Sequence, residues 1–169
     1  MRLILFFLII LSTAISVTAC SDDPNSPAFP VEPESTTSTE LPAETMNETM
    51  YITINGKTVT CRLVDNATTR ALQEKLNEGD FSYNAHEYGG FEMVGSIGFS
   101  LPVSNAQMTT KPGDVVLYNG NNICIFAGQN SWSYTYLGRI EGLSDDEIRA
   151  FLNLESGDAT VTFSASAKD

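Results

Sequence analysis

Short apolar runs separated by polar turns dominate the middle of the chain, between residues 113 and 143. Each run is rich in β-branched and aromatic residues and is bounded by Gly, Asn or Ser; the runs cover 115–118, 123–126 and 134–137. Runs of this length and composition are typical of short, buried strands. Asn119-Gly120 favours a hairpin between the first two runs, because both central residues of a type I′ turn need a positive φ. This stretch therefore predicts the central strands of a β domain.

Alternating apolar and polar positions predict a second hairpin nearer the N-terminus. Residues 51–54 and 57–63 alternate on either side of Asn55-Gly56, which again favours a type I′ turn. Five residues share its expected buried face: Ile52, Ile54, Val59, Cys61 and Leu63.

The remaining segments of the domain are less regular. Residues 81–88 alternate weakly and residues 160–166 alternate clearly, so each is expected to form a strand. Residues 87–95 contain two adjacent glycines between aromatic residues and predict a glycine-rich loop. Residues 102–111 predict a long polar connection.

Capping residues predict two short helices. Asp65 or Asn66 can cap the first helix, whose apolar residues recur at helical spacing: Ala67, Ala71, Leu72 and Leu76. Ser144 and Glu147 form a capping box for the second, which continues to about Asn153. About eight short strands with two helices between them predict a mainly β fold, a closed eight-stranded antiparallel barrel with two capping helices, because closure removes exposed strand edges.

The first twenty residues have the pattern of a signal peptide. Arg2 gives a positive start, and the apolar run Leu3–Leu11 is too short for a transmembrane span of about 20 residues. Small residues directly before Cys20 resemble the cleavage site of bacterial lipoproteins, in which this Cys becomes the first residue and carries diacylglycerol. The resemblance implies that residues 1–19 are removed and that lipid on Cys20 anchors the protein in the bacterial cell envelope, outside the cytoplasm. In the alternative, the signal is an ordinary secretory one and Cys20 is incidental.

Residues 20–49 predict a disordered tether. They contain five of the seven prolines, many Ser and Thr, seven acidic residues and no Lys or Arg. Such a segment has too little apolar surface to offset the entropy of ordering, and Pro and like charge extend it. A partner-binding acidic tail is the alternative. Residues 50–169 then form the barrel domain.

The charge of the domain excludes some functions. Residues 50–169 contain 14 acidic and 8 basic residues and no basic cluster. Nucleic-acid binding is therefore not expected, because the phosphate backbone requires Lys and Arg. Direct docking of the domain onto anionic lipid is disfavoured for the same reason.

The strongest candidate for a binding site surrounds Trp132, the single tryptophan. The pattern places it in a polar loop between two strands, where it can stack on a ligand while Gln129 and Asn130 orient that ligand. In the alternative, the Trp132 ring only fills the mouth of the barrel. The full candidate groove consists of aromatic and amide residues: Tyr88, Phe91, Tyr118, Gln129, Asn130, Trp132 and Tyr134.

The other reactive residues do not predict catalysis. His86 is the only histidine and is expected on the surface. Cys61 and Cys124 are expected to point inward from strands, either bridged or as two buried thiols. These three residues lack the spacing of a metal site, and neither a metal nor a cofactor is predicted. Three acids are expected to be structural or solvated rather than a catalytic pair: Glu87, Glu92 and Asp114.

Six stretches of the domain resemble the bacterial and archaeal cyclophilin-like domain family, in the same order and at similar spacing. They are ITINGKTVTCRL, DNATTRAL, YGGFEMVG, TTKPGDVVLYNGNNICIFAG, NSWSYTYLGRIEGL and SGDATVTFS, spread over about residues 50–166. The resemblance implies an eight-stranded cyclophilin-type barrel. Cyclophilin prolyl isomerases use an Arg, a Phe-rich pocket, a Gln and a His or Trp in one groove, and the motifs around their catalytic Arg are missing here. The resemblance therefore implies the barrel and not the active site.

Together these features predict a binding module. The leading hypothesis is a membrane-anchored, extracytoplasmic barrel that presents its groove to a peptide segment or a small ligand. One alternative is a divergent peptidyl-prolyl cis-trans isomerase. Another is an accessory domain that docks onto a redox or envelope partner, because similar domains occur joined to flavodoxin-like domains.

Overall fold

The computed structural model describes residues 47–167. The expected signal peptide, Cys20 and nearly all of the tether fall in residues 1–46, outside the described residues, and those expectations stay predictions. Within residues 47–167, neither the length nor the hydropathy of any helix is sufficient for a membrane span.

The described chain forms nine strands and two α-helices. In chain order they are β1 (Thr49–Ile54), β2 (Lys57–Leu63), α1 (Ala67–Glu78), β3 (Phe81–Tyr88), β4 (Glu92–Ser96), β5 (Ala106–Thr109), β6 (Asp114–Tyr118), β7 (Asn122–Phe126), β8 (Ser131–Ile140), α2 (Asp145–Leu152) and β9 (Ala159–Ser164). A short 3-10 helix, η1 (Leu154–Ser156), joins α2 to β9. Both helices and all strands except β4 and β5 were predicted from the pattern of apolar residues.

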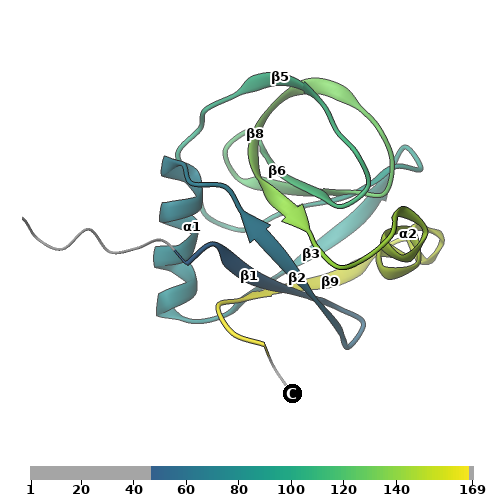
Figure 1. Ribbon diagram of the computed structural model, residues 1–169, viewed down its shortest axis with the longest axis horizontal. Helices are drawn as coiled ribbons and strands as arrows, with labels where there is room; N and C mark the ends of the chain where they lie inside the picture. Colours follow the sequence, from purple (N-terminus) through teal and green to yellow (C-terminus); the bar gives the residue numbers. More distant parts are fainter. Residues whose placement is uncertain (1–46, 168–169) are drawn as a thin grey trace, which may run out of the picture. The chain divides into compact units, whose positions relative to one another are not determined.

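Eight of these strands close into an antiparallel barrel. They follow one another in the order β2-β1-β9-β3-β4-β7-β6-β8, and β8 pairs with β2 to complete the circle. β5 is an additional strand that pairs only with β8. The two helices α1 and α2 lie on opposite sides of the barrel (Figure 1). This arrangement confirms the predicted mainly β barrel with two short helices.

Alternate residues of the barrel strands point inward and form one apolar core, which we call the interior cluster. Both helices add side chains to it: Leu72 and Leu76 from α1, and Ile148, Phe151 and Leu152 from α2. The predicted caps are confirmed, because the side chains of Asn66 and Ser144 accept hydrogen bonds from backbone N–H groups of their helices. The predicted position of Ala67 on the buried stripe is wrong: Ala67 is exposed, whereas Thr68 and Thr69 are buried.

Positive φ angles confirm the two predicted hairpins. Asn55 and Gly56 have φ of 50° and 74°, and Asn119 and Gly120 have φ of 51° and 77°. The turn between β6 and β7 is one residue longer than a two-residue type I′ turn, as the register of the flanking strands shows. Short-range turn chemistry thus decides both hairpins.

Two segments predicted as loops are strands. Residues 92–96 form β4, which pairs with β3 on one side and with β7 on the other. Residues 106–109 form β5, whose side chains are mostly exposed, so its sequence shows no apolar alternation. Trp132 likewise lies on β8, opposite Met108 of β5, and not in a loop. In each case a strand distant in sequence supplies backbone hydrogen bonds, β7 to β4 and β8 to β5, and local sequence does not reveal that partner.

Candidate functional site

The outer face of the barrel carries a second apolar cluster. Along β7, Ile123 and Ile125 belong to the interior cluster, whereas Cys124 and Phe126 point to the opposite face of the strand. We call this second group the outer cluster; its buried members are Val116, Cys124, Phe126 and Tyr134. The predicted inward direction of Cys124 is therefore wrong. Cys61 does belong to the interior cluster, and both thiols are free.

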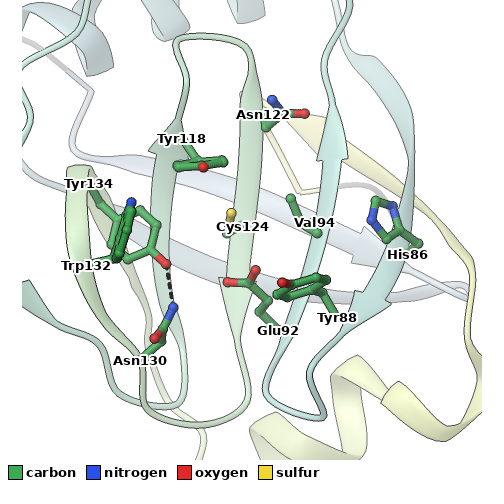
Figure 2. A pocket seen from close by; sticks show the side chains of 10 residues that line it. All are labelled: His86, Tyr88, Glu92, Val94, Tyr118, Asn122, Cys124, Asn130, Trp132 and Tyr134. Carbon is green, nitrogen blue, oxygen red and sulfur yellow. Dashed lines mark hydrogen bonds between the residues drawn. The ribbon is translucent and has the colours of Figure 1, made fainter.

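A pocket of about 500 Å³ opens on this outer face, a volume within the range of small-molecule sites. Its lining comes from β3, β4, β6, β7, β8 and the residue before β8: His86, Tyr88, Glu92, Val94, Tyr118, Asn122, Cys124, Asn130, Trp132 and Tyr134. Strand register brings these residues together, since His86 lies opposite Val94 and Val94 lies opposite Cys124. Figure 2 shows Glu92 and Cys124 near the middle of the lining, between two groups of side chains: Tyr118, Trp132 and Tyr134 on one side, His86 and Tyr88 on the other.

Exposed aromatic rings form the edges of the pocket. Trp132 is 57% exposed and Tyr88 is 60% exposed, although large aromatic residues are usually well buried. Trp132 therefore does not fill the mouth of the barrel, because its ring stands beside an open pocket on the outer face. Asn130 Nδ2 donates to Tyr134 Oη at 2.8 Å and so holds these two side chains beside Trp132.

The structure brings together five of the seven residues predicted for the groove: Tyr88, Tyr118, Asn130, Trp132 and Tyr134. Phe91 and Gln129 do not line the pocket. The Phe91 ring stacks on Phe126 of the outer cluster, with ring centroids 6.3 Å apart and 5° between the ring planes. It also meets the Tyr88 ring edge-on, so it supports the pocket from behind. Gln129 is exposed to solvent.

Glu92 is the pocket residue that sequence reasoning missed most clearly. The sequence predicts a structural or solvated carboxylate, but Glu92 is only 6% exposed and its Oε2 has no hydrogen-bond partner among the described residues. Alternation was the available signal, because Glu92 and Val94 lie two residues apart on one face of β4. Tyr88, opposite Glu92 on β3, continues the same surface. The glycines of the preceding turn concealed this alternation by suggesting a loop.

Burial controls the ionisation of the pocket. It raises the pKa of Glu92 to about 7, because the charged carboxylate loses hydration. Burial, and secondly the charge of Glu92, raise the pKa of Tyr134 to about 12. The same two causes raise the pKa of the Cys124 thiol above its usual range, which makes Cys124 a poor nucleophile at neutral pH. Glu92 thus titrates near neutrality, at the centre of the lining.

Among the residues that the structure describes, no lysine or arginine lines the pocket. Within residues 47–167 each arginine pairs with a carboxylate elsewhere: Arg62 with Glu48, Arg70 with Asp65, Arg139 with Asp114 and Arg149 with Asp146. The described residues also contain no group of three His, Cys, Asp or Glu side chains that could hold a metal ion. His86 is exposed, as predicted, and reaches only the edge of the pocket. The lining therefore combines aromatic rings, two amides and one buried carboxyl group.

Two solved structures resemble the barrel. McbB in complex with tryptophan matches with a TM-score of 0.54 and 15% identity, over 71% of this chain and 46% of the McbB chain, so this chain spans less than half of that protein. The hypothetical protein AF2241 from Archaeoglobus fulgidus matches with a TM-score of 0.52 and 12% identity, over 75% of this chain and 100% of that one. At these identities the likeness shows the fold alone.

Sequence comparison adds the family. No curated protein matches the chain. The model of the cyclophilin-like family, in contrast, matches residues 52–164, from β1 to the last residue of β9. The match covers the whole barrel that carries the pocket, and the chain therefore belongs to the cyclophilin-like family.

Proposed function

We propose that this cyclophilin-like protein is a binding module that holds a small molecule or a short peptide segment in its outer pocket. The observation that carries the proposal is the pocket of about 500 Å³ itself, built over the outer cluster. Sites for small ligands usually combine apolar and aromatic walls with a few polar groups that fix orientation. Here Tyr88 and Trp132 supply walls, while Glu92, Asn122 and Asn130 supply the polar groups.

The pocket is largely preformed, which favours binding because little has to be ordered when a ligand arrives. Its floor consists of paired strands with buried side chains on both faces. The hydrogen bond from Asn130 to Tyr134 and the stacking of Phe91 on Phe126 hold side chains in place at two further points.

We also propose that lipid on Cys20 anchors this module in the bacterial cell envelope, outside the cytoplasm. Support comes from the apolar run that precedes Cys20 and from the small residues directly before it. The acidic, proline-rich tether would then hold the barrel at a distance from the membrane surface.

The single tryptophan provides a direct test, because its fluorescence reports on the pocket. We expect aromatic compounds and amides from a fragment library to shift the emission of Trp132 in the full chain, and ligand-observed NMR to detect the same compounds. In the NMR measurement, Trp132→Ala and Tyr88→Ala weaken their binding. Val103→Ala, at an exposed apolar residue outside the pocket, leaves it unchanged.

Two results would overturn the proposal. One is a fragment library in which no compound loses affinity in the two pocket variants. The other is acceleration of prolyl isomerisation in a proline peptide by the full chain, lost in the same variants, which would identify an enzyme rather than a binding module.

A further inference from the structure

Residues 47–167 contain two buried carboxylates, and only one of them is satisfied. Asp114 accepts hydrogen bonds from the backbone N–H of Lys111 at 2.8 Å and from Arg139 Nη1 at 2.9 Å. Glu92 is 6% exposed, and its buried Oε2 has no partner. A buried polar atom without a partner costs folding free energy, which a bound ligand could recover. Tyr83 Oη is also buried without a partner, but Tyr83 belongs to the interior cluster, whereas Glu92 lines the pocket.

No lysine or arginine of the described residues faces Glu92. The lining contains no Lys or Arg, and every described arginine is paired with another carboxylate. His86 lies on the same side of β3 as Tyr88 but opposite Val94 rather than Glu92, and it is exposed. Within residues 47–167 Glu92 therefore has no cationic partner, and a ligand could supply one.

The amides of the lining also present acceptors. Asn130 Nδ2 donates one hydrogen bond to Tyr134 Oη at 2.8 Å, and Asn122 Nδ2 donates one to Asn121 Oδ1 at 2.9 Å. Among the described residues, no donor is bound to the side-chain oxygen of Asn122 or of Asn130. A ligand that donates hydrogen bonds can therefore reach these two oxygens and Glu92, whereas a carboxylate or phosphate would be repelled by the charge of Glu92.

Aromatic rings surround this acceptor-rich centre. Tyr88, Tyr118, Trp132 and Tyr134 all line the pocket, and Figure 2 shows them on both sides of Glu92. The face of an aromatic ring attracts a positive charge, that of Trp most strongly. Rings of this kind together with a carboxylate favour an organic cation over a neutral molecule of the same shape.

We propose that the pocket binds a small organic cation, with an ammonium group paired to Glu92 and an apolar body packed against Trp132 and the tyrosines. The inference rests on the proposed function, that the pocket is a binding site, and adds the chemical class of its ligand. A free small molecule is the occupant we assign, because a volume of about 500 Å³ lies within the range of small-molecule sites.

Three probes of similar size and different charge test the inference: phenethylamine, 2-phenylethanol and phenylacetate. Binding to the full chain is followed through the emission of Trp132 at pH 8. We expect phenethylamine to bind about tenfold more tightly than 2-phenylethanol, the difference typical of a hydrogen bond to a charged group. Phenylacetate is expected to bind more weakly than either.

Glu92→Gln removes this preference, so that amine and alcohol bind equally. The matched control is Glu87→Gln, the same substitution at a β3 residue outside the lining, and it keeps the preference.

The charge of Glu92 provides a second readout. The titratable groups that line the pocket around Glu92 are His86 and Tyr88 on β3, Tyr118 on β6, Cys124 on β7 and Tyr134 on β8. We expect the affinity for phenethylamine to rise about tenfold between pH 6 and pH 8, as the carboxyl group ionises. This rise is lost in Glu92→Gln.

Three outcomes would overturn the inference. Equal binding of amine and alcohol to the native chain would show that the pocket does not prefer a cation. The pocket would still be a binding site. Failure of phenethylamine to bind, with library fragments still bound in the pocket, would do the same. Tighter binding of a lysine tripeptide than of phenethylamine would show that the ligand is a peptide and not a free small molecule.

Discussion

Met108 of β5 lies directly opposite Trp132 of β8. β5 takes no part in closing the barrel and pairs with β8 alone. The Met108 side chain is partly buried against the outer cluster, whereas Trp132 is 57% exposed. Because more than half of Trp132 is exposed, we infer that its position at the edge of the pocket depends on β5.

Met108→Ala is expected to loosen Trp132 while the barrel stays folded. The variant loses apolar contact worth about 1 kcal/mol, because Met108 is only partly buried. We expect the fluorescence anisotropy of Trp132 to fall, and fragments that bind in the pocket to bind several-fold more weakly. Gln107→Ala, at the neighbouring exposed residue of β5, is the matched control. Unchanged anisotropy in Met108→Ala would show that β5 does not position Trp132.

Glu92→Gln is expected to stabilise the ligand-free protein above pH 7. Burial raises the pKa of Glu92 from 4.5 to about 7 in the folded state, so between these values the folded protein holds a proton that the unfolded chain has lost. The native protein therefore loses stability as the pH rises through this range, by on the order of 2 kcal/mol after allowance for solvent screening in the pocket. Glutamine has no charge to bury and escapes this loss. Urea unfolding of both proteins between pH 5 and pH 8 measures the difference.

Asp114→Asn is the control with the opposite sign. Asp114 is as deeply buried as Glu92, but Arg139 and the Lys111 N–H satisfy its carboxylate. Loss of its charge is expected to destabilise the protein by about 2 kcal/mol at neutral pH. A difference in stability between the native protein and Glu92→Gln that stays constant with pH would contradict the prediction for Glu92. It would show that ionisation of the Glu92 carboxyl group does not destabilise the folded protein.

Gly138→Ala is expected to disrupt closure of the barrel. Gly138 pairs with Leu63 at the seam between β2 and β8, and a Cβ at position 138 would collide with the backbone carbonyl oxygen of Arg62. Relief requires the two strands to separate, so we expect a loss of about 3 kcal/mol in the free energy of unfolding. Gly142→Ala is the control, because a Cβ at position 142 has no neighbouring atom within 4 Å. We expect it to cost only the backbone strain of a non-glycine residue at a φ of 77°, about 1 kcal/mol. Equal losses in the two variants, measured by urea unfolding, would argue against a tight seam.

Cys20→Ser is expected to release the protein from membranes. The native chain, expressed in a bacterium supplied with radiolabelled palmitate, should incorporate the label and sediment with the membrane fraction, because acyl chains on Cys20 would hold it there. Cys20→Ser should do neither. Cys124→Ala, at a thiol buried beneath the pocket, should keep the label. Label in Cys20→Ser would exclude this anchor.

Local sequence determined the hairpins and the helix caps. Asn55-Gly56 and Asn119-Gly120 specify their turns because a positive φ depends on the residue itself. Asn66 and Ser144 specify helix starts because a cap needs partners only two or three residues away. Every one of these features is complete within a few positions of the chain, and the family resemblance then supplied the barrel that joins them.

Tertiary structure alone decided which strands border the pocket and which groups it buries. β4 pairs with the adjacent β3, but its other partner, β7, and the single partner of β5, β8, lie more than twenty residues away. Cys124 belongs to a run that is apolar on both faces, so alternation could not say which face turns outward. The burial of Glu92 depends on the pairing of β4 with β7, which places Glu92 opposite Phe126 of the outer cluster. Sequence can place a carboxylate on a strand. The free-energy cost of its charge depends on the burial and the hydrogen-bond partners that the neighbouring strands provide.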